Sequence, residues 1–308
     1  MADSELPRLT RTFTTPHPTD LRLTLGQLKR GRGDPTMALE TDGFWRATRT
    51  PDGPATMRIT KTSASVFAVE AWGSGAQWVA DRAPVLLGAN DDLDAFPDHH
   101  EGVLRLHHAF RHWRTPCTQA VFEVLFPVVL EQKVTGKEAR SSYARLARLL
   151  GEPAPQPDRR APRLLLPPSP AVVAGTPTHV FHQANVERKR SDTIKRAATY
   201  GHRLEPLGDQ TAEAAREALR CLPGIGEWSV AEILTLAFGD NDAVSVGDYH
   251  VKNWVSWNLA GEPRGSDEFM LELLEPFRPF RGRVARLLQL GGSPPPRYGP
   301  RITIQKRW

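Results

Sequence analysis

The stretch that decides the fold is LPGIGEWSVAEIL, from Leu222 to Leu234. Pro223 fixes one backbone angle, and Gly224 and Gly226 permit a tight turn that a side chain would obstruct. The preceding TAEAAREALRCL has helical composition, and apolar residues recur at helical spacing after the turn. We therefore predict two helices joined by a glycine turn. The bare N–H groups of such a turn can bind an anion, so it is either a simple connection or a phosphate site.

The composition narrows the class of protein. The chain has 308 residues, 40% hydrophobic and 24% charged, which is typical of a globular protein of about two domains. Two cysteines are too few for a disulfide framework or for the ligands of an iron–sulfur cluster. The N-terminus lacks an apolar signal core, and no apolar run reaches the ~18 residues of a membrane span. We expect a soluble, cytoplasmic monomer without a membrane partner.

The charge is unevenly distributed along the chain. Residues 1–100 carry a net charge of −2, and residues 101–308 carry +7. A basic C-terminal part favours a polyanion held by phosphate contacts, but a solvated surface explains so modest a charge equally well.

The chain divides into a region with a strand-like sequence pattern and a region with a helical one. Between residues 10 and 85, short alternating runs such as LRLTLG and SVFAVEAW predict strands, with a hairpin turn at Thr50–Gly53. From residue 101 the pattern is helical, and AVFEVLFPVVL (Ala120–Leu130) predicts a buried helix that Pro127 should kink or interrupt. Seven of the 20 residues from 151 to 170 are proline, which indicates an extended loop.

Two groups of polar residues are candidate sites. Asp248 lies 22 residues beyond Gly226, at the predicted start of a helix in VGDYHVKNW. It is either a capping residue or a carboxylate directed at a nucleotide held by the turn. His108 and His112 are spaced i, i+4 but lack a recognisable third ligand, so we expect no catalytic metal.

Taken together, these motifs resemble a known family. LPGIGEWSVAEI followed by VGDYHVKN is similar to the helix-hairpin-helix DNA glycosylases (the HhH-GPD superfamily), in particular the 3-methyladenine glycosylase II branch. FEVLFPVVLEQKVTGKEA and RPFRGRVARLLQL resemble the family's DNA-facing loop and its closing helix. The resemblance covers about residues 80–292.

The resemblance implies an α+β fold. Residues 1–98 would form an antiparallel β-rich, TBP-like N-terminal domain, and residues 99–292 an all-α glycosylase domain that contains the proline-rich loop 151–170. Residues 293–308 would be a basic tail, either a DNA contact or a disordered end.

The resemblance also implies a chemistry. The enzyme would rotate a damaged base out of double-stranded DNA and hydrolyse its N-glycosidic bond, with Asp248 stabilising the positive charge on the sugar. An alkylated purine is already cationic, so no second catalytic carboxylate would be required. Trp228 stands where bifunctional members carry a Schiff-base lysine, which implies a monofunctional enzyme that leaves an abasic site in base excision repair.

Further roles follow from the same resemblance. Trp228 and Tyr249 would line the base pocket, together with Glu232 and Gln289 where relatives carry aromatic residues. The residues expected to contact DNA are Gln132, Lys133, Pro223, Gly224, Ile225, Gly226 and Ser229. The backbone carbonyls of Arg220, Leu222 and Ile225 would bind a structural Na⁺ or K⁺, and no catalytic cofactor or iron–sulfur cluster is expected.

The departures from the family leave alternatives open. Relatives place an apolar wedge where this chain has Lys133, and Glu232 and Gln289 make the pocket polar. The protein is then a glycosylase with a shifted range of lesions, or a weakly active or non-catalytic protein that binds DNA or senses damage. A glycosylase with lyase activity on oxidised bases is disfavoured by Trp228.

Overall fold

The N-terminal part of the chain forms a five-stranded antiparallel sheet in this computed structural model, which describes residues 8–41, 43–158 and 161–296. The strand order is β1-β5-β4-β3-β2. The strands are β1 (Arg8–Thr14), β2 (Met37–Leu39), β3 (Phe44–Thr50), β4 (Gly53–Lys61) and β5 (Val66–Trp72). Thr50 pairs with Gly53 across a two-residue turn, which confirms the predicted hairpin. The predicted β-rich start and α+β class are confirmed.

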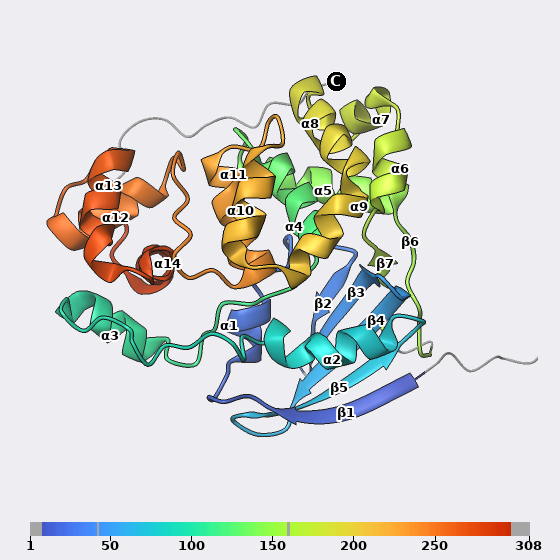
Figure 1. Cartoon of the computed structure of the whole chain (residues 1–308), viewed down its shortest axis with the longest axis horizontal. Helices are drawn as coiled ribbons and strands as arrows, with labels where there is room; N and C mark the ends of the chain where they lie inside the picture. The colour runs from blue at the N-terminus through green and yellow to red at the C-terminus, as the bar shows by residue number, and fades with distance from the viewer. Residues whose placement is uncertain (1–7, 42, 159–160, 297–308) are drawn as a thin grey trace, which may run out of the picture.

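Two helices of the N-terminal part lie in the region whose pattern predicted strands. The run LRLTLG forms helix α1 (Leu21–Leu25), so the strand prediction there is wrong. The Asp20 carboxylate caps this helix by accepting a hydrogen bond from Leu23 N at 2.9 Å, and Leu21, Thr24 and Leu25 are buried. A run this short fits both the two-residue period of a strand and the ~3.6-residue period of a helix, and the Asp20 cap favours the helix. Helix α2 (Ala76–Leu86) lies against β1, β4 and β5 (Figure 1).

The remaining chain is predominantly helical, as predicted. The α-helices are α3 (Glu101–Ala109), α4 (Val121–Glu131), α5 (Gly136–Leu150), α6 (Pro170–Gly175), α7 (Thr178–Gln183), α8 (Arg188–Thr199), α9 (Gly201–Leu204), α10 (Ala212–Arg220), α11 (Glu227–Ile233), α12 (Val251–Ala260), α13 (Asp267–Leu274) and α14 (Arg281–Gly291). The short helical segments are η1 (Glu205–Asp209), the π-helical η2 (Leu234–Phe238) and η3 (Glu275–Phe277). No helix of the described residues is both long enough and apolar enough to cross a membrane.

Helix α4 is continuous through Pro127, so the proline does not interrupt it. Nine of the eleven residues of this helix are buried, all but Glu123 and Glu131, and α4 contacts α5, α8, α11 and η1. Burial on all sides stabilises the helix enough to tolerate the hydrogen bond that a proline cannot donate.

The apolar core is divided into two large clusters. One joins the sheet to the helices packed around α4, and the other joins α3, α12, α13 and α14, the group at the left of Figure 1. The boundary predicted at residue 98 stays a prediction.

The proline-rich loop 151–170 contains two short strands, β6 (Glu152–Pro153) and β7 (Leu165–Leu166), which pair with each other. Its Leu164 and Leu166 pack with Trp45 and Trp72 of the sheet in a third, small cluster. The loop therefore covers part of the sheet. The predicted tail begins at Ser293, and its residues from 297 onward lie outside the described residues.

Candidate active site

The glycine turn joins α10 to α11, as the sequence predicts. Gly224 has φ +96°, and a Cβ there would lie 2.4 Å from Thr193 Oγ1 on α8. Only glycine fits this close approach without rearrangement. No atom lies within 4 Å of the Cβ position at Gly226, so this glycine leaves the outer surface of the turn bare. The turn is packed on one side and open on the other.

Side chains from two other helices hold the turn in place. Arg196 of α8 donates a hydrogen bond to the Pro223 carbonyl at 3.0 Å. Gln132, which follows α4, donates from Nε2 to the Gly224 carbonyl at 3.0 Å and to Ser229 Oγ at 2.9 Å. The structure thus brings Gln132 together with the turn, while the adjacent Lys133 is exposed and has φ 55°.

Asp248 is held at the start of α12. Its Oδ1 accepts hydrogen bonds from His250 N at 2.7 Å and Val251 N at 3.0 Å, so the carboxylate binds the N–H groups at the start of the helix from three residues before Val251. Its Oδ2 accepts a hydrogen bond from the indole Nε1 of Trp228 at 3.1 Å. Both oxygens are oriented, and the two residues singled out in the sequence are in direct contact.

Asp248 and Trp228 line a cavity of about 220 Å³. Its walls come from α4, α11, α12 and α14, and therefore from both large apolar clusters. The lining residues are Glu131, Trp228, Glu232, Ala243, Ser245, Asp248, Val251, Gly282, Ala285, Arg286 and Gln289. Of the predicted pocket residues, Trp228, Glu232 and Gln289 are among them.

The cavity is polar and contains more carboxylates than the sequence suggested. Glu232 Oε1 accepts hydrogen bonds from Ser245 Oγ at 2.5 Å and from Arg286 Nη2 at 3.3 Å. Glu131 Oε1 accepts one from Arg30 Nη1 at 3.0 Å. Burial raises the pKa of Glu131, Arg30 opposes this, and the negative charge of Glu232 adds to it.

Sequence reasoning missed Glu131, Ser245 and Arg286. Helical spacing could have identified Arg286, because it lies one turn before Gln289 on α14. Glu131 stands directly before the predicted DNA contact Gln132, but nothing in the sequence indicates that α4 ends at a cavity.

Tyr249 lies outside the cavity. It is 69% exposed, and its ring meets His250 edge-on with the centroids 5.0 Å apart. Its predicted place in the base pocket is therefore not seen in this arrangement, although it is adjacent to Asp248 in the chain.

The turn carries the carbonyl oxygens predicted to bind a monovalent cation. The Leu222 carbonyl accepts a hydrogen bond from Ile225 N at 3.0 Å, which leaves its second lone pair available. Carbonyl oxygens suit a hard cation, and the Na⁺ or K⁺ site stays a prediction. Among the described residues, no three His, Cys, Asp or Glu side chains form a group that could hold a metal ion.

No protein-family model matches this sequence, and no curated protein is similar to it. Solved structures are similar in fold. A 3-methyladenine DNA glycosylase from Archaeoglobus fulgidus has a TM-score of 0.75 at 18% identity, covering 90% of this chain and 96% of that chain. The apo form of an 8-oxoguanine glycosylase/lyase from Clostridium acetobutylicum has a TM-score of 0.65 at 11% identity, covering 93% and 98%. Its complex with double-stranded DNA also has a TM-score of 0.65 at 11% identity, covering 92% and 97%. The chain therefore shares its fold with these solved DNA glycosylases.

Proposed function

We propose that this protein is a monofunctional DNA glycosylase that excises alkylated purines, of the 3-methyladenine type, in base excision repair. The observation that carries the proposal is the oriented carboxylate of Asp248 on the wall of a cavity of about 220 Å³. The fold shared with solved DNA glycosylases supports it.

The chemistry follows from the position of Asp248. When the C1′–N bond of a damaged nucleotide breaks, the electron pair leaves with the base and positive charge develops on the sugar. The carboxylate stabilises that charge, and water then adds to C1′ and loses a proton, which leaves an abasic site. The hydrogen bonds from His250 N, Val251 N and Trp228 Nε1 fix the carboxylate before the substrate arrives.

The absence of lyase activity is inferred from Trp228. An indole cannot form a Schiff base with the sugar, so the strand should remain intact after base release. Trp228 instead presents an aromatic ring to the cavity, where it can stack on a cationic base.

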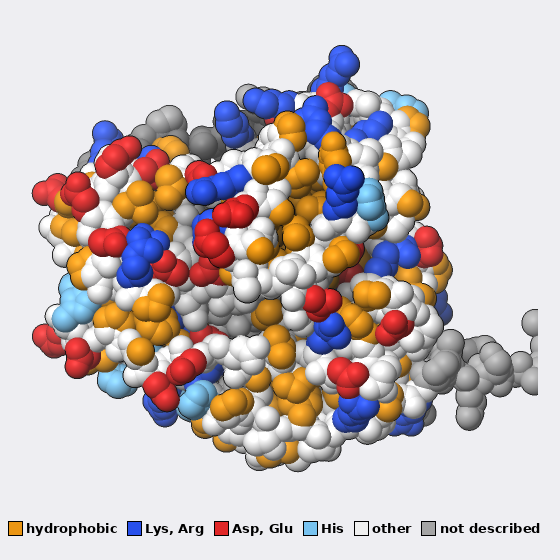
Figure 2. All heavy atoms as spheres, viewed as in Figure 1, with side chains coloured by type: hydrophobic (Ala, Val, Ile, Leu, Met, Phe, Trp, Pro, Cys, Tyr) orange, Lys and Arg blue, Asp and Glu red, His pale blue; other side chains and the backbone are white. Residues whose placement is uncertain are grey.

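DNA binding is assigned to the glycine turn and to the basic side chains around it. Bare N–H groups at the turn favour a phosphate, with Gly226 open to solvent. Arg188, Lys189 and Arg196 of the neighbouring α8 are exposed, and Figure 2 shows Lys and Arg side chains gathered along this upper edge of the molecule. Lys133, where relatives place an apolar wedge, would contact the duplex from the end of α4.

The polar cavity favours one alternative. Glu131, Glu232 and Gln289 can form hydrogen bonds to a base, so the preferred lesion can differ from simple methylpurines. A non-catalytic damage sensor is the remaining alternative, and it does not require an oriented carboxylate.

The test is base release from methylated duplex DNA by the wild type and by Asp248→Asn, with and without alkali. We expect the wild type to leave alkali-labile sites, and the substitution to reduce release by roughly 100- to 1,000-fold while duplex binding survives. Asp209→Asn, an exposed aspartate of η1 that pairs with Arg82, is the matched control and should release base normally. Binding without release by the wild type would favour the sensor, and strand cleavage without alkali would contradict the monofunctional assignment.

A further inference from the structure

The cavity contains an unbalanced set of charges. Three carboxylates line it, those of Glu131, Glu232 and Asp248, against the single guanidinium of Arg286. Arg286 is already hydrogen-bonded to Glu232. A positively charged occupant would therefore meet a negative environment.

Each glutamate is anchored through one oxygen only. Glu131 is held through Oε1 by Arg30, and Glu232 is held through Oε1 by Ser245 and Arg286. Within the described part of the chain, neither Oε2 atom has a hydrogen-bond partner. The anchored oxygen orients each side chain, and the other oxygen stays available to a base.

The two glutamates also repel each other. Glu232 contributes to the raised pKa of Glu131, after burial as the main cause, while Arg30 and Arg140 oppose the shift. A cation bound in the cavity would relieve this repulsion, whereas a neutral base of the same shape would bury the two charges without compensation. Trp228 is the one aromatic residue on the cavity wall in the described structure, so stacking is limited to a single ring.

We propose that Glu131 and Glu232 are specificity-determining residues that select a positively charged purine over a neutral one by charge. This inference rests on the proposed function and adds to it the residues that distinguish the damaged base. Selectivity would then come from the negative charge of the two carboxylates, which together with Asp248 outweigh the guanidinium of Arg286 on the cavity wall.

The test is a binding measurement that does not depend on catalysis. Two duplexes are compared, one containing N7-methylguanine and the other guanine, each on a 2′-fluorinated sugar that resists hydrolysis because fluorine opposes positive charge at C1′. The dissociation constants are measured slightly below neutral pH, where the methylated guanine is cationic. We expect the wild type to prefer the methylated duplex.

Glu131→Gln and Glu232→Gln keep the shape of the side chain and remove its charge. Each should reduce the preference for the methylated duplex by about tenfold, because the cationic base binds less tightly and the neutral base no longer buries that charge. Glu213→Gln, on the exposed face of α10 and outside the cavity, is the matched control and should leave the preference unchanged. Thermal melting of each variant verifies that it is folded.

The outcomes separate this inference from the proposed function. Equal weakening of both duplexes, or an unchanged preference, in the folded glutamine variants would overturn charge selection, even if Asp248 still supports base release. If the wild type prefers the methylated duplex but releases no base, and the glutamine variants lose that preference, charge selection is supported and the glycosylase proposal is contradicted.

Discussion

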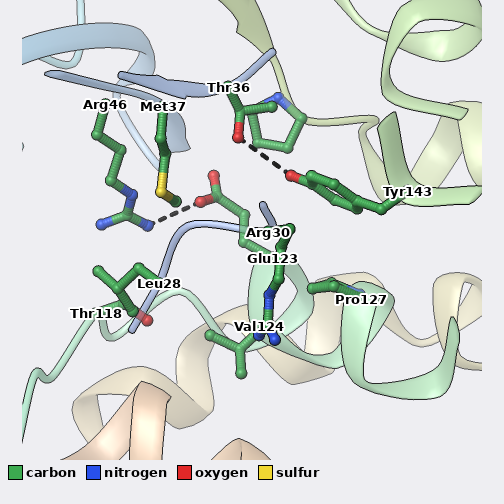
Figure 3. A pocket seen from close by; sticks show the side chains of 11 residues that line it. Leu28, Arg30, Thr36, Met37, Arg46, Thr118, Glu123, Val124, Pro127 and Tyr143 are labelled. Atoms are coloured by element: carbon green, nitrogen blue, oxygen red, sulfur yellow. Dashed lines mark hydrogen bonds and ion pairs between the residues drawn. The ribbon is translucent and has the colours of Figure 1, made fainter. Parts of the chain in front are cut away.

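Helix α4 carries two glutamates whose surroundings differ at its two ends. Glu123, in the first turn, faces the sheet and a cavity of about 20 Å³, and Figure 3 shows it joined to Arg46. Its Oε2 accepts from Arg46 at 2.8 Å, and its Oε1 accepts from Thr48 Oγ1 at 2.6 Å and Arg49 N at 2.8 Å. Glu131, the last residue of the helix, faces the cavity of about 220 Å³ with one oxygen anchored.

The two glutamates differ in role: the carboxylate of Glu123 is part of the protein's internal hydrogen bonding, whereas that of Glu131 can bind a ligand. The small cavity has room for about one water molecule, and both oxygens of Glu123 are occupied by protein donors. Nearby, Thr36 Oγ1 and Tyr143 OH form a further buried hydrogen bond at 3.1 Å (Figure 3). Glu123 therefore joins the sheet to α4, while Glu131 retains an oxygen for a ligand.

The largest effect that would test this comparison is the stability loss in Glu123→Ala. Arg46 is 2% exposed and would lose its ion-pair partner, so we expect the free energy of unfolding to fall by about 3 kcal/mol or more. Glu131→Ala should cost less, about 1 kcal/mol, because burial and the negative charge of Glu232 already disfavour its charged form and offset its pair with Arg30. Urea denaturation of both variants measures the difference. Equal losses would contradict the distinction between the two ends of α4.

A second carboxyl, that of Glu205, lies at the start of α4 and makes the stability of this end of the helix pH-dependent. Burial, and then the negative charge of Glu123, raise the pKa of Glu205 to about 7, while hydrogen bonds from the backbone N–H groups of Phe122 and Val121 lower it. A pKa raised by folding means that stability is highest below the unfolded value and falls as the pH rises through about 7.

Glu205→Gln should remove this pH dependence. Its carbonyl oxygen can accept the same backbone hydrogen bonds without gaining a charge, so the variant should be more stable than the wild type by about 2 kcal/mol near pH 8. The difference should shrink toward zero near pH 5, as measured by urea denaturation at both pH values. A constant difference across that range would show that ionisation of Glu205 is not its cause.

Local signals in the sequence predicted much of the fold. Pro223 and the two glycines of the turn act through their own backbone, so the helix–turn–helix unit could be read directly. The apolar run of α4 was equally clear. The short LRLTLG run was misassigned, because its helical state depends on the Asp20 cap and on burial of one side.

The candidate site was only partly predictable, for a physical reason. Trp228 and Asp248 were found from motifs, but their hydrogen bond depends on how the segment before α12 lies against the start of α11. Glu131 reaches the cavity because α4 ends there, and its partner Arg30 comes from a distant part of the chain, next to the sheet. Such contacts between remote segments leave no periodic pattern in the sequence.

The smallest expected effect lies immediately beyond Glu131. Gln132→Ala removes two hydrogen bonds to the glycine turn, so we expect a stability loss of about 1 kcal/mol and faster amide exchange in residues 222–226. Lys133→Ala is the control, because its side chain is exposed, and it should leave exchange in the turn unchanged. Hydrogen exchange followed by mass spectrometry compares the two variants. If both variants loosen the turn equally, its position depends on the whole segment after α4 rather than on the Gln132 amide. If only Gln132→Ala does so, the cavity-facing end of α4 also positions the turn proposed to bind DNA.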